Sequence, residues 1–293
     1  MVEQAIEDII SDQLAKLQKL GVMKSIHVAI DKHLIPRYDK KPGPELLRSK
    51  SKKGTYRFEG YITAQCVDAG SRLTLAALPV GMGHSTADFV RKIVQTCDKY
   101  GIKVKCFFMD REFFSVSVLE AMNSHDKSFV IPCKNTYNVV AALDEFDKKI
   151  RDGTSEVTLE NQDSAVKYIM VVQKRTARKD KSPDAPAHER YIGFAANSNE
   201  TDVAAYRKRW GIETAYRQIE GIRLKTRSTN PAARLFCFAA TVVLFNQWVV
   251  INADYGFGEN DKWQGITFTV LTFKAIMVSR WQIRPEPPPV TAP

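Results

Sequence analysis

Residues 104–113 read Val-Lys-Cys-Phe-Phe-Met-Asp-Arg-Glu-Phe, and the class of the fold follows from this stretch. Its first six residues form a nearly continuous apolar run, which is typical of a strand buried on both faces of a sheet. A sheet covered by helices on both faces is an α/β arrangement. The run ends on Asp110. A carboxylate placed directly after a buried strand is held by that strand while its oxygens remain accessible.

Strand and helix patterns continue on both sides of this run. Up to residue 132 the sequence predicts, in chain order, strands at 25–30, 55–67 and 71–78, a helix at 85–100, the strand at 104–109, a helix at 115–123 and a strand at 128–132. The turn at 68–70 (Asp-Ala-Gly) indicates a hairpin. We therefore predict a mixed five-stranded sheet flanked by helices. If its first and fourth strands are parallel neighbours, Asp31 and Asp110 lie side by side at their carboxyl ends.

The sequence leaves two interpretations open for each of the features that follow the first strand. Asp31 is either a functional carboxylate positioned by its strand or an ordinary aspartate in the turn that ends it. Residues 36–54 contain seven lysines and arginines and three prolines. They form either a solvated loop or an arm that contacts phosphates.

Residues 133–189 interrupt the alternating pattern, and we interpret them as an inserted subdomain. Their patterns are a helix at 138–151, strands near 155–160 and 166–174, and a charged, proline-containing loop at 175–189. The predicted division of the chain is an N-terminal helix (1–24), a first core part (25–132), the insertion (133–189), a second core part (190–284) and a proline-rich disordered tail (285–293).

One helix is predicted over residues 206–225, with Thr201 or Asp202 as its cap. Its inward face consists of residues at helical spacing, namely Ile212, Tyr216 and Ile219. Glu213 stands on this helix among basic residues and tyrosines. Taken alone, such a segment is more often a solvated ladder of salt bridges. The two upstream acids give Glu213 a second interpretation, as the third member of a metal site.

Composition and charge point to a folded protein with a polyanionic partner. Of the 293 residues, 44% are hydrophobic, and the formal net charge is +10. The first number supports a packed core, and the second favours nucleic acid through its phosphates. Five scattered cysteines and five scattered histidines have no metal-ligand spacing. We therefore expect reduced thiols, a cytoplasmic location and no zinc site. A nucleic-acid partner would make this location nucleoid-associated.

The apolar run at 235–250 raises the question of a membrane span. It contains Asn246 and Gln247 and falls short of the roughly 20 uninterrupted apolar residues that a span requires. We therefore interpret it as a buried core helix.

Asp31, Asp110 and Glu213 together suit one kind of chemistry. Mg²⁺ takes oxygen ligands and keeps several waters, so two or three carboxylates with substrate phosphates complete its coordination. Two such ions about 4 Å apart can activate an attacking water or hydroxyl and stabilise the leaving oxygen of a phosphodiester. The basic side chains beside Glu213 would hold neighbouring phosphates.

These motifs resemble those of the DDE transposases of prokaryotic insertion sequences, in the group with the signature Tyr-x2-Arg-x3-Glu-x6-Lys. Tyr206, Arg209 and Glu213 match the signature, and residues 110–113 (Asp-Arg-Glu-Phe) match a second motif of that group. Asp31 fits the first acid. The similarity covers about residues 22–252. It implies a ribonuclease H-like catalytic core with a β-containing insertion before the last catalytic helix, which 133–189 would supply.

The resemblance also implies a mechanism, a cofactor and partners. Asp31 would bridge two Mg²⁺ ions, for which Mn²⁺ can substitute, and Asp110 and Glu213 would each complete one. Water would free a 3′-hydroxyl at the transposon end, and this hydroxyl would attack a second phosphodiester in line. The partners would be transposon-end and target DNA, bound by a homodimer. The residues expected to contact DNA are Tyr206, Arg209, Trp210, Arg217, Lys225 and Arg111, where Trp210 either stacks on an unpaired base or belongs to the core.

The chain departs from the family pattern in two places. The signature lysine position holds Glu220, which would either add negative charge near the metals or pair with Arg217. Arg217, Arg223 or Lys225 could replace the missing lysine. Second, about 24 residues precede the first strand, where such transposases usually carry an end-recognising domain. We therefore expect a fragment, a truncated element or a co-opted catalytic core.

Three other functions stay open at this point. A catalytically silent DNA-binding protein derived from a transposase would share the charge and the fold. A junction resolvase or another ribonuclease H-like nuclease would share the three acids but would not join DNA. A basic globular protein without a metal site would need three unrelated acids to follow the family order by chance.

Overall fold

The computed structural model of the chain describes residues 2–21, 25–39, 43, 45–69, 72–81, 85–150, 152–175, 185–256 and 265–281. The predicted disordered tail at 285–293 lies outside these residues, as does most of the charged loop at 175–189.

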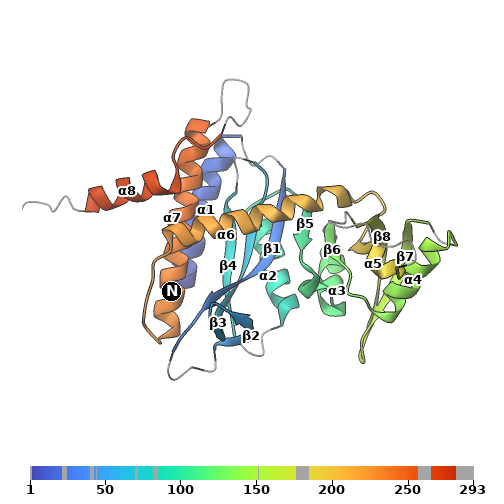
Figure 1. Cartoon of the computed structure of the whole chain (residues 1–293). Coiled ribbons are helices and arrows are strands. Elements are labelled where there is room, and N and C mark those ends of the chain that lie inside the picture. The colour runs from blue at the N-terminus through green and yellow to red at the C-terminus, as the bar shows by residue number, and fades with distance from the viewer. Residues whose placement is uncertain are drawn as a thin grey trace, which may run out of the picture.

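A mixed sheet forms the centre of the molecule (Figure 1). Its middle consists of three parallel strands, β1 (Ile26–Pro36), β5 (Val104–Met109) and β6 (Phe129–Pro132). The strand β3 (Thr55–Cys66) runs antiparallel to β1, and β4 (Thr74–Val80) runs antiparallel to β3. These five strands follow the order β4-β3-β1-β5-β6. The first and fourth predicted strands are therefore parallel neighbours, which is the condition under which Asp31 and Asp110 were expected to lie side by side.

The sheet is larger than the predicted five strands, because it has nine. One addition is β2 (Leu47–Lys52), which pairs with β3; residues 36–54 are thus not a loop throughout. The other three continue the sheet beyond β6 in the order β9 (Tyr191–Ala196), β8 (Ala165–Lys174) and β7 (Thr154–Glu160). Two helices, α4 (Tyr137–Asp147) and α5 (Ala187–Arg190), lie beside them at the far end of the molecule (Figure 1).

Helices cover both faces of the sheet. On one face, the buried residues Val28 and Ile30 of β1 share a core with α2 (Thr86–Lys99) and α3 (Val116–Ser124). Ala29 points to the other face, because side chains alternate along a strand. There it shares a smaller core with Phe108, Val130 and Ile212.

The helix that carries Glu213 is shorter than predicted. Residues 206–225 do not form one helix; a 3-10 helix, η2 (Val203–Arg209), leads into α6 (Trp210–Ile222). Asp202 caps η2 by accepting a hydrogen bond of 3.1 Å from the Ala205 amide. Gly211 allows the start of α6 to approach the end of β3, since a Cβ there would lie 3.1 Å from Cβ of Val67.

Two long helices, α1 (Val2–Lys19) and α7 (Pro231–Gly256), pack side by side against the sheet (Figure 1). Within the described residues, α7 is the helix whose length and apolar composition would allow it to cross a membrane. Its residue Asn246 is fully buried and hydrogen-bonded to both backbone groups of Thr74. These contacts agree with a core helix. The chain continues into α8 (Val270–Trp281), which projects from the body of the molecule (Figure 1).

Candidate active site

Two parallel strands bring Asp31 and Asp110 together. The pairing of β1 with β5 places Ala29 opposite Phe108 and ends with Ile30 opposite Met109. The next residue on each strand is an aspartate. Because side chains alternate, both aspartates point to the face that α6 covers.

Asp31 does not end its strand, which corrects the sequence prediction. The pairing of β1 with β3 continues to Pro36, opposite Phe58, while β5 stops at Met109. Asp31 is therefore held in the middle of β1, opposite Thr63 of β3. The interpretation of Asp31 as an ordinary turn aspartate is wrong, because no turn begins there.

The surroundings of Asp31 disfavour its negative charge. Burial, followed by the like charge of Asp110, raises the pKa of Asp31 to about 6; Arg209 and the Lys32 amide act in the opposite direction, and Glu213 adds a smaller increase. Burial also raises the pKa of Asp110. Asp110 accepts a hydrogen bond of 2.8 Å from the Glu112 amide and so caps the 3-10 helix η1 (Arg111–Phe113). A pair of buried like charges is an environment that binds a cation.

Side chains of η2 and α6 fix the helix above these acids. The Tyr206 hydroxyl donates to the carbonyl of Met109 at 3.0 Å. The hydroxyls of Tyr216 and Thr63 are 2.6 Å apart. Ile212 is fully buried in the core beneath α6. Glu213 follows about 100° further around the helix. Its side chain is half exposed, and its charge acts on Asp31.

Arg209 joins two of the three acids. Its Nη1 lies 3.4 Å from Oδ2 of Asp31, and its Nη2 lies 3.0 Å from Oε1 of Glu213. The guanidinium is mostly buried, so this pairing is screened less than a surface pair. Asp31, Asp110 and Glu213 thus belong to one electrostatic cluster, but a cation of the protein itself lies between two of them.

The described residues contain no group of three acidic, histidine or cysteine side chains close enough, as they stand, to hold a metal ion. The chemistry of the acids nevertheless fits a hard divalent cation, which prefers carboxylate oxygens. Asp31 and Asp110 lie on the same face of neighbouring strands, and the charge of Asp110 is, after burial, the second cause of the raised pKa of Asp31. Glu213 is the acid that Arg209 holds in an ion pair instead.

The residues predicted to contact DNA occupy different positions around this cluster. Trp210 is 68% exposed, so it is not part of the core, and its stacking on a base stays a prediction. Arg217 is exposed on α6, with its Nη2 3.4 Å from the Thr214 hydroxyl. Arg111 is exposed beside Asp110. Tyr206 is half-buried between Phe108 and Phe194, and its hydroxyl donates a hydrogen bond to the Met109 carbonyl.

The end of α6 differs from the prediction as well. Glu220 pairs with Arg223 at 2.9 Å and not with Arg217. Lys225 lies beyond the helix, where it lines a polar hollow of about 180 Å³ together with Arg37 and Arg223. The predicted replacement of the signature lysine by one of these cations stays a prediction.

The sequence did not predict that His33 and Thr63 lie beside the acidic cluster, in contact with Tyr216. The His33 ring lies against that of Tyr216, with centroids 4.4 Å apart and planes tilted by 42°. Burial, with the charges of Arg223 and Lys52, lowers the pKa of His33 to about 4. The available signal was the alternation of β1, which puts residue 33 on the face of residue 31. Thr63 depends on the register between β1 and β3, for which the sequence holds no local signal.

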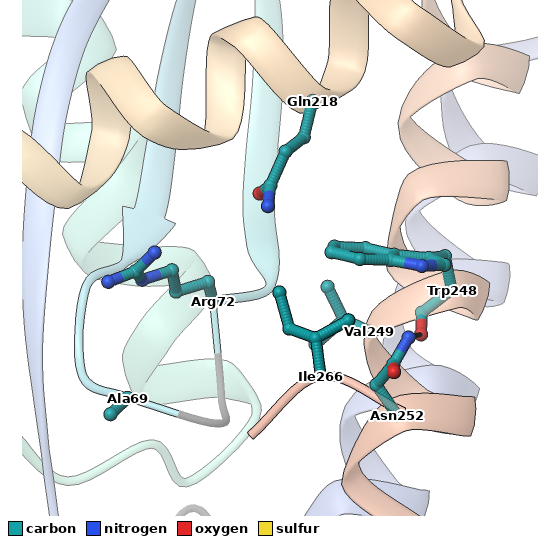
Figure 2. Close-up of a pocket in the computed structure, with 7 residues that line it drawn as sticks. All are labelled: Ala69, Arg72, Gln218, Trp248, Val249, Asn252 and Ile266. Carbon is teal, nitrogen blue, oxygen red and sulfur yellow. Dashed lines mark hydrogen bonds between the residues drawn. The ribbon is translucent and has the colours of Figure 1, made fainter. Parts of the chain in front are cut away.

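A separate hollow of about 100 Å³ lies between α6 and α7 (Figure 2). Gln218 enters it from α6, and Trp248 and Asn252 enter it from α7. Gln218 lies roughly 140° around the helix from Glu213, at 100° per residue. This hollow is therefore distinct from the acidic cluster.

The pKa of Asp31 predicts how stability depends on pH. Its folded-state value of about 6 lies above the ordinary 3.8. Between these values the folded protein keeps a proton that the unfolded chain has lost, so stability falls as Asp31 ionises. In EDTA, we expect Asp31→Asn to gain on the order of 3 kcal/mol over the wild type as the pH rises through this range, at about 1.4 kcal/mol per pKa unit.

Urea unfolding from about pH 4 to about pH 8 measures this difference. The advantage of Asp31→Asn should grow between pH 3.8 and about 6 and then stay constant. Asp98→Asn, on the exposed surface, is the control and should show no such rise. A difference between Asp31→Asn and the wild type that is the same at every pH would contradict the prediction.

Comparison with known proteins places these observations in a family. A family model described as "Transposase DDE domain" matches residues 23–245. The piggyBac transposase, in a synaptic complex with hairpin DNA, has a TM-score of 0.56 and 11% identity, over 96% of this chain and 60% of its own. The Drosophila P element transposase, in a strand transfer complex, has a TM-score of 0.24 and 8% identity, over 83% of this chain and 53% of its own.

Sequence identities of 11% and 8% can support a shared fold but not a shared function. The TM-score of 0.24 for the P element transposase is too low to support a shared fold either. The piggyBac likeness supports the predicted ribonuclease H-like fold, and this chain spans 60% of that protein's length. No curated protein matches the chain. The family match covers well over half of the residues and includes Asp31, Asp110 and Glu213. The chain therefore belongs to the family of DDE transposases.

Proposed function

We propose that this chain is a DNA transposase that cuts the phosphodiester at a transposon end and joins the freed 3′-hydroxyl to a second DNA site. The observation that carries this proposal is the pair of partly buried carboxylates of Asp31 and Asp110, where β5 ends beside its parallel neighbour β1. Glu213 shares their electrostatic cluster from α6. This arrangement in a DDE transposase domain supports phosphodiester chemistry over a purely structural role.

Asp31, Asp110 and Glu213 are the residues proposed to hold Mg²⁺ or Mn²⁺. When bound, such ions activate an attacking water or hydroxyl and neutralise charge on the leaving oxygen. Burial of the two aspartates favours uptake of a cation, since it disfavours their unpaired negative charges.

The chain's own cations would position the DNA. Arg209 keeps its guanidinium between Asp31 and Glu213, and this group can exchange a carboxylate for a phosphate because both accept the same forked hydrogen bonds. Arg217 and Trp210 lie on the exposed side of η2 and α6, where a nucleotide backbone and an unpaired base can reach them. No serine, cysteine or tyrosine nucleophile is required.

A catalytically silent DNA-binding protein is the second candidate, and one observation favours it. Arg209 already pairs with Asp31 and Glu213, so a chain in which these ion pairs persist would bind DNA without cutting it. Glu220, which occupies the position of the signature lysine, also favours a silent protein. A ribonuclease H-like nuclease or junction resolvase has no observation of its own in its favour.

A strand-transfer assay separates these functions. The chain is incubated with supercoiled plasmid and a labelled, pre-cut duplex in Mg²⁺ or Mn²⁺, with EDTA as the control. A transposase nicks the plasmid and joins the labelled 3′-end to it. A nuclease nicks without joining, and a silent protein shifts the DNA but does neither. Absence of joining in both metals, with DNA bound, would contradict the proposed function.

A further inference from the structure

The β2–β3 hairpin forms an arm at the β2 edge of the sheet. Lys52 pairs with Thr55 across a two-residue turn, in which Lys53 and Gly54 have φ angles of 53° and 79°. Positive φ at both central residues is typical of the turns that match the twist of a hairpin. We call residues 47–58 the arm. Its shape is set by backbone pairing and not by a ligand.

The arm presents an unusual concentration of positive charge. Residues 48–52 are all exposed, and every second one is a cation: Arg48, Lys50 and Lys52. Arg57 of β3 lies directly opposite Arg48. Like charges in this position destabilise a strand pair. Among the residues that the structure describes, no carboxylate pairs with these four cations, so the arm lacks an internal counter-charge.

Two acids that precede the arm in the chain, Asp39 and Glu45, form ion pairs with cations outside the arm, and these partners anchor its base. Asp39 is 3.0 Å from Arg37 and 2.9 Å from the buried Arg234. Glu45 is 3.1 Å from Arg234. Arg37 also donates to the carbonyls of residues 226 and 228, at 3.2 and 3.1 Å. The base of the arm is therefore tied to the segment that follows α6.

Two exposed tyrosines accompany the cations. Tyr56 is 51% exposed, and the Arg57 guanidinium lies 5.2 Å from its ring centre. Tyr38 is 66% exposed, and its hydroxyl donates to the Lys53 carbonyl at 2.6 Å. Arginine and lysine with neighbouring tyrosines are the side chains that most often bind phosphates and sugars of nucleic acid.

Positive charge continues from the arm toward the acidic cluster. Arg37, at the base of the arm, shares a polar hollow with Arg223 and Lys225, and Glu59 is the acid among its lining residues. The charges of Arg223 and Lys52 both act on His33. His33 lies two residues beyond Asp31, about 7 Å along the strand. A polyanion bound at the arm would thus meet cations on its way to Asp31.

We propose that the arm binds the phosphodiester backbone of duplex DNA flanking the site of chemistry, without regard to sequence. This inference rests on the proposed function, because it assigns the arm a part of the same DNA. Charge complementarity selects the partner: the arm offers cations at every second residue and no carboxylate, and a duplex offers a regular row of phosphates. The arm increases the affinity for DNA and takes no part in phosphodiester cleavage.

Protection of a sheet edge is the ordinary explanation for lysines on an exposed strand. That role does not require Arg57 opposite Arg48, nor tyrosines beside them. The two explanations also predict different results. Loss of edge protection causes aggregation, whereas loss of a phosphate contact lowers the affinity for duplex and weakens its dependence on salt.

The test compares two triple variants that lose the same charge. The arm variant is Arg48→Gln, Lys50→Gln and Lys52→Gln. The control variant is Lys99→Gln, Lys103→Gln and Lys105→Gln, near the end of β5 opposite to Asp110. Binding of a labelled duplex of about 30 base pairs is followed by fluorescence anisotropy in EDTA, from about 50 to about 200 mM NaCl.

For the arm variant we expect a loss of affinity on the order of 10- to 100-fold at about 150 mM salt and a salt slope smaller by about 2 to 3, at about 0.9 per phosphate contact. The control variant should keep the wild-type slope. A further variant, Arg48→Glu, tests whether misfolding causes the loss of affinity. It places opposite charges across the hairpin, facing Arg57, and should therefore not weaken the strand pair. It should retain the wild-type melting temperature and still lose affinity.

Each other outcome has a definite meaning. Equal losses in both triple variants would show a general charge effect and overturn the role of the arm while leaving the proposed function intact. Aggregation of the arm variant with unchanged affinity would assign the lysines to edge protection. Loss of binding to anionic vesicles but not to duplex would assign the arm to a membrane surface. A wild-type chain that binds no duplex at any salt would refute the proposed function itself.

Discussion

Replacement of Asp110 by asparagine should lower DNA cleavage and strand transfer by about three orders of magnitude, because bound metal ions contribute several kcal/mol to such reactions and about 1.4 kcal/mol corresponds to a factor of ten. Asparagine removes the charge that a cation needs but keeps an oxygen that can accept the bond from the Glu112 amide. The cap of η1 should therefore survive, and the loss should be one of function and not of folding.

The same assay separates this effect from a general loss of acidic charge. Asp98→Asn removes a surface carboxylate whose partner is Lys127, and it should cleave and join DNA at the wild-type rate. Glu213→Gln should be as inactive as Asp110→Asn if all three acids act as a unit. All three variants should bind duplex in EDTA as the wild type does. Wild-type turnover by Asp110→Asn would remove Asp110 from the site.

Replacement of Asn246 by leucine should destabilise the fold by about 4 kcal/mol, because a buried backbone group left without a partner costs about 1–3 kcal/mol. The Asn246 side chain accepts from the Thr74 amide and donates to the Thr74 carbonyl, both at 2.9 Å. Both residues are fully buried. Leucine fills a similar volume but leaves both groups of Thr74 unpaired. The expected loss is a large part of the roughly 5–15 kcal/mol that holds a domain folded.

Chemical unfolding followed by circular dichroism measures this change. Gln247→Leu is the matched control: it makes the same kind of substitution at the next residue of α7, which is half-buried. Its effect should stay within about 0.5 kcal/mol. Equal stability of Asn246→Leu and the wild type would show that water or a shifted backbone satisfies Thr74 instead.

The strands and helices nearest the site were predictable because their signals are local. The apolar run at 104–109 is the strand β5 at the same residues, and Gly101, with a φ of 63°, ends the preceding helix as expected. The segment 133–189 contains α4, β7 and β8 close to the predicted positions. In each case a few neighbouring residues carry the information, through apolar periodicity or through a backbone angle that glycine tolerates.

The arrangement of side chains inside the site was less predictable. Asp110 and Glu213 were proposed from motifs and Asp31 from the strand before it, but the ion pair between Arg209 and Asp31 joins residues 178 positions apart. The length of β1 was also missed, since its second half is held by β3 and not by its own sequence pattern. The strand β2 escaped prediction for the same reason: residues 48–52 are polar throughout, and only their pairing with β3 makes this part of the predicted loop or arm a strand.

The sequence by itself determined the order of the elements, the three candidate acids and the excess of positive charge. Tertiary structure alone decided that Asp31 sits in mid-strand beside Asp110 with a raised pKa, that Arg209 lies between Asp31 and Glu213, and that the cations of 48–57 gather on one hairpin. The physical reason is that burial and Coulomb interactions depend on distances in space, and strand register between remote segments fixes those distances.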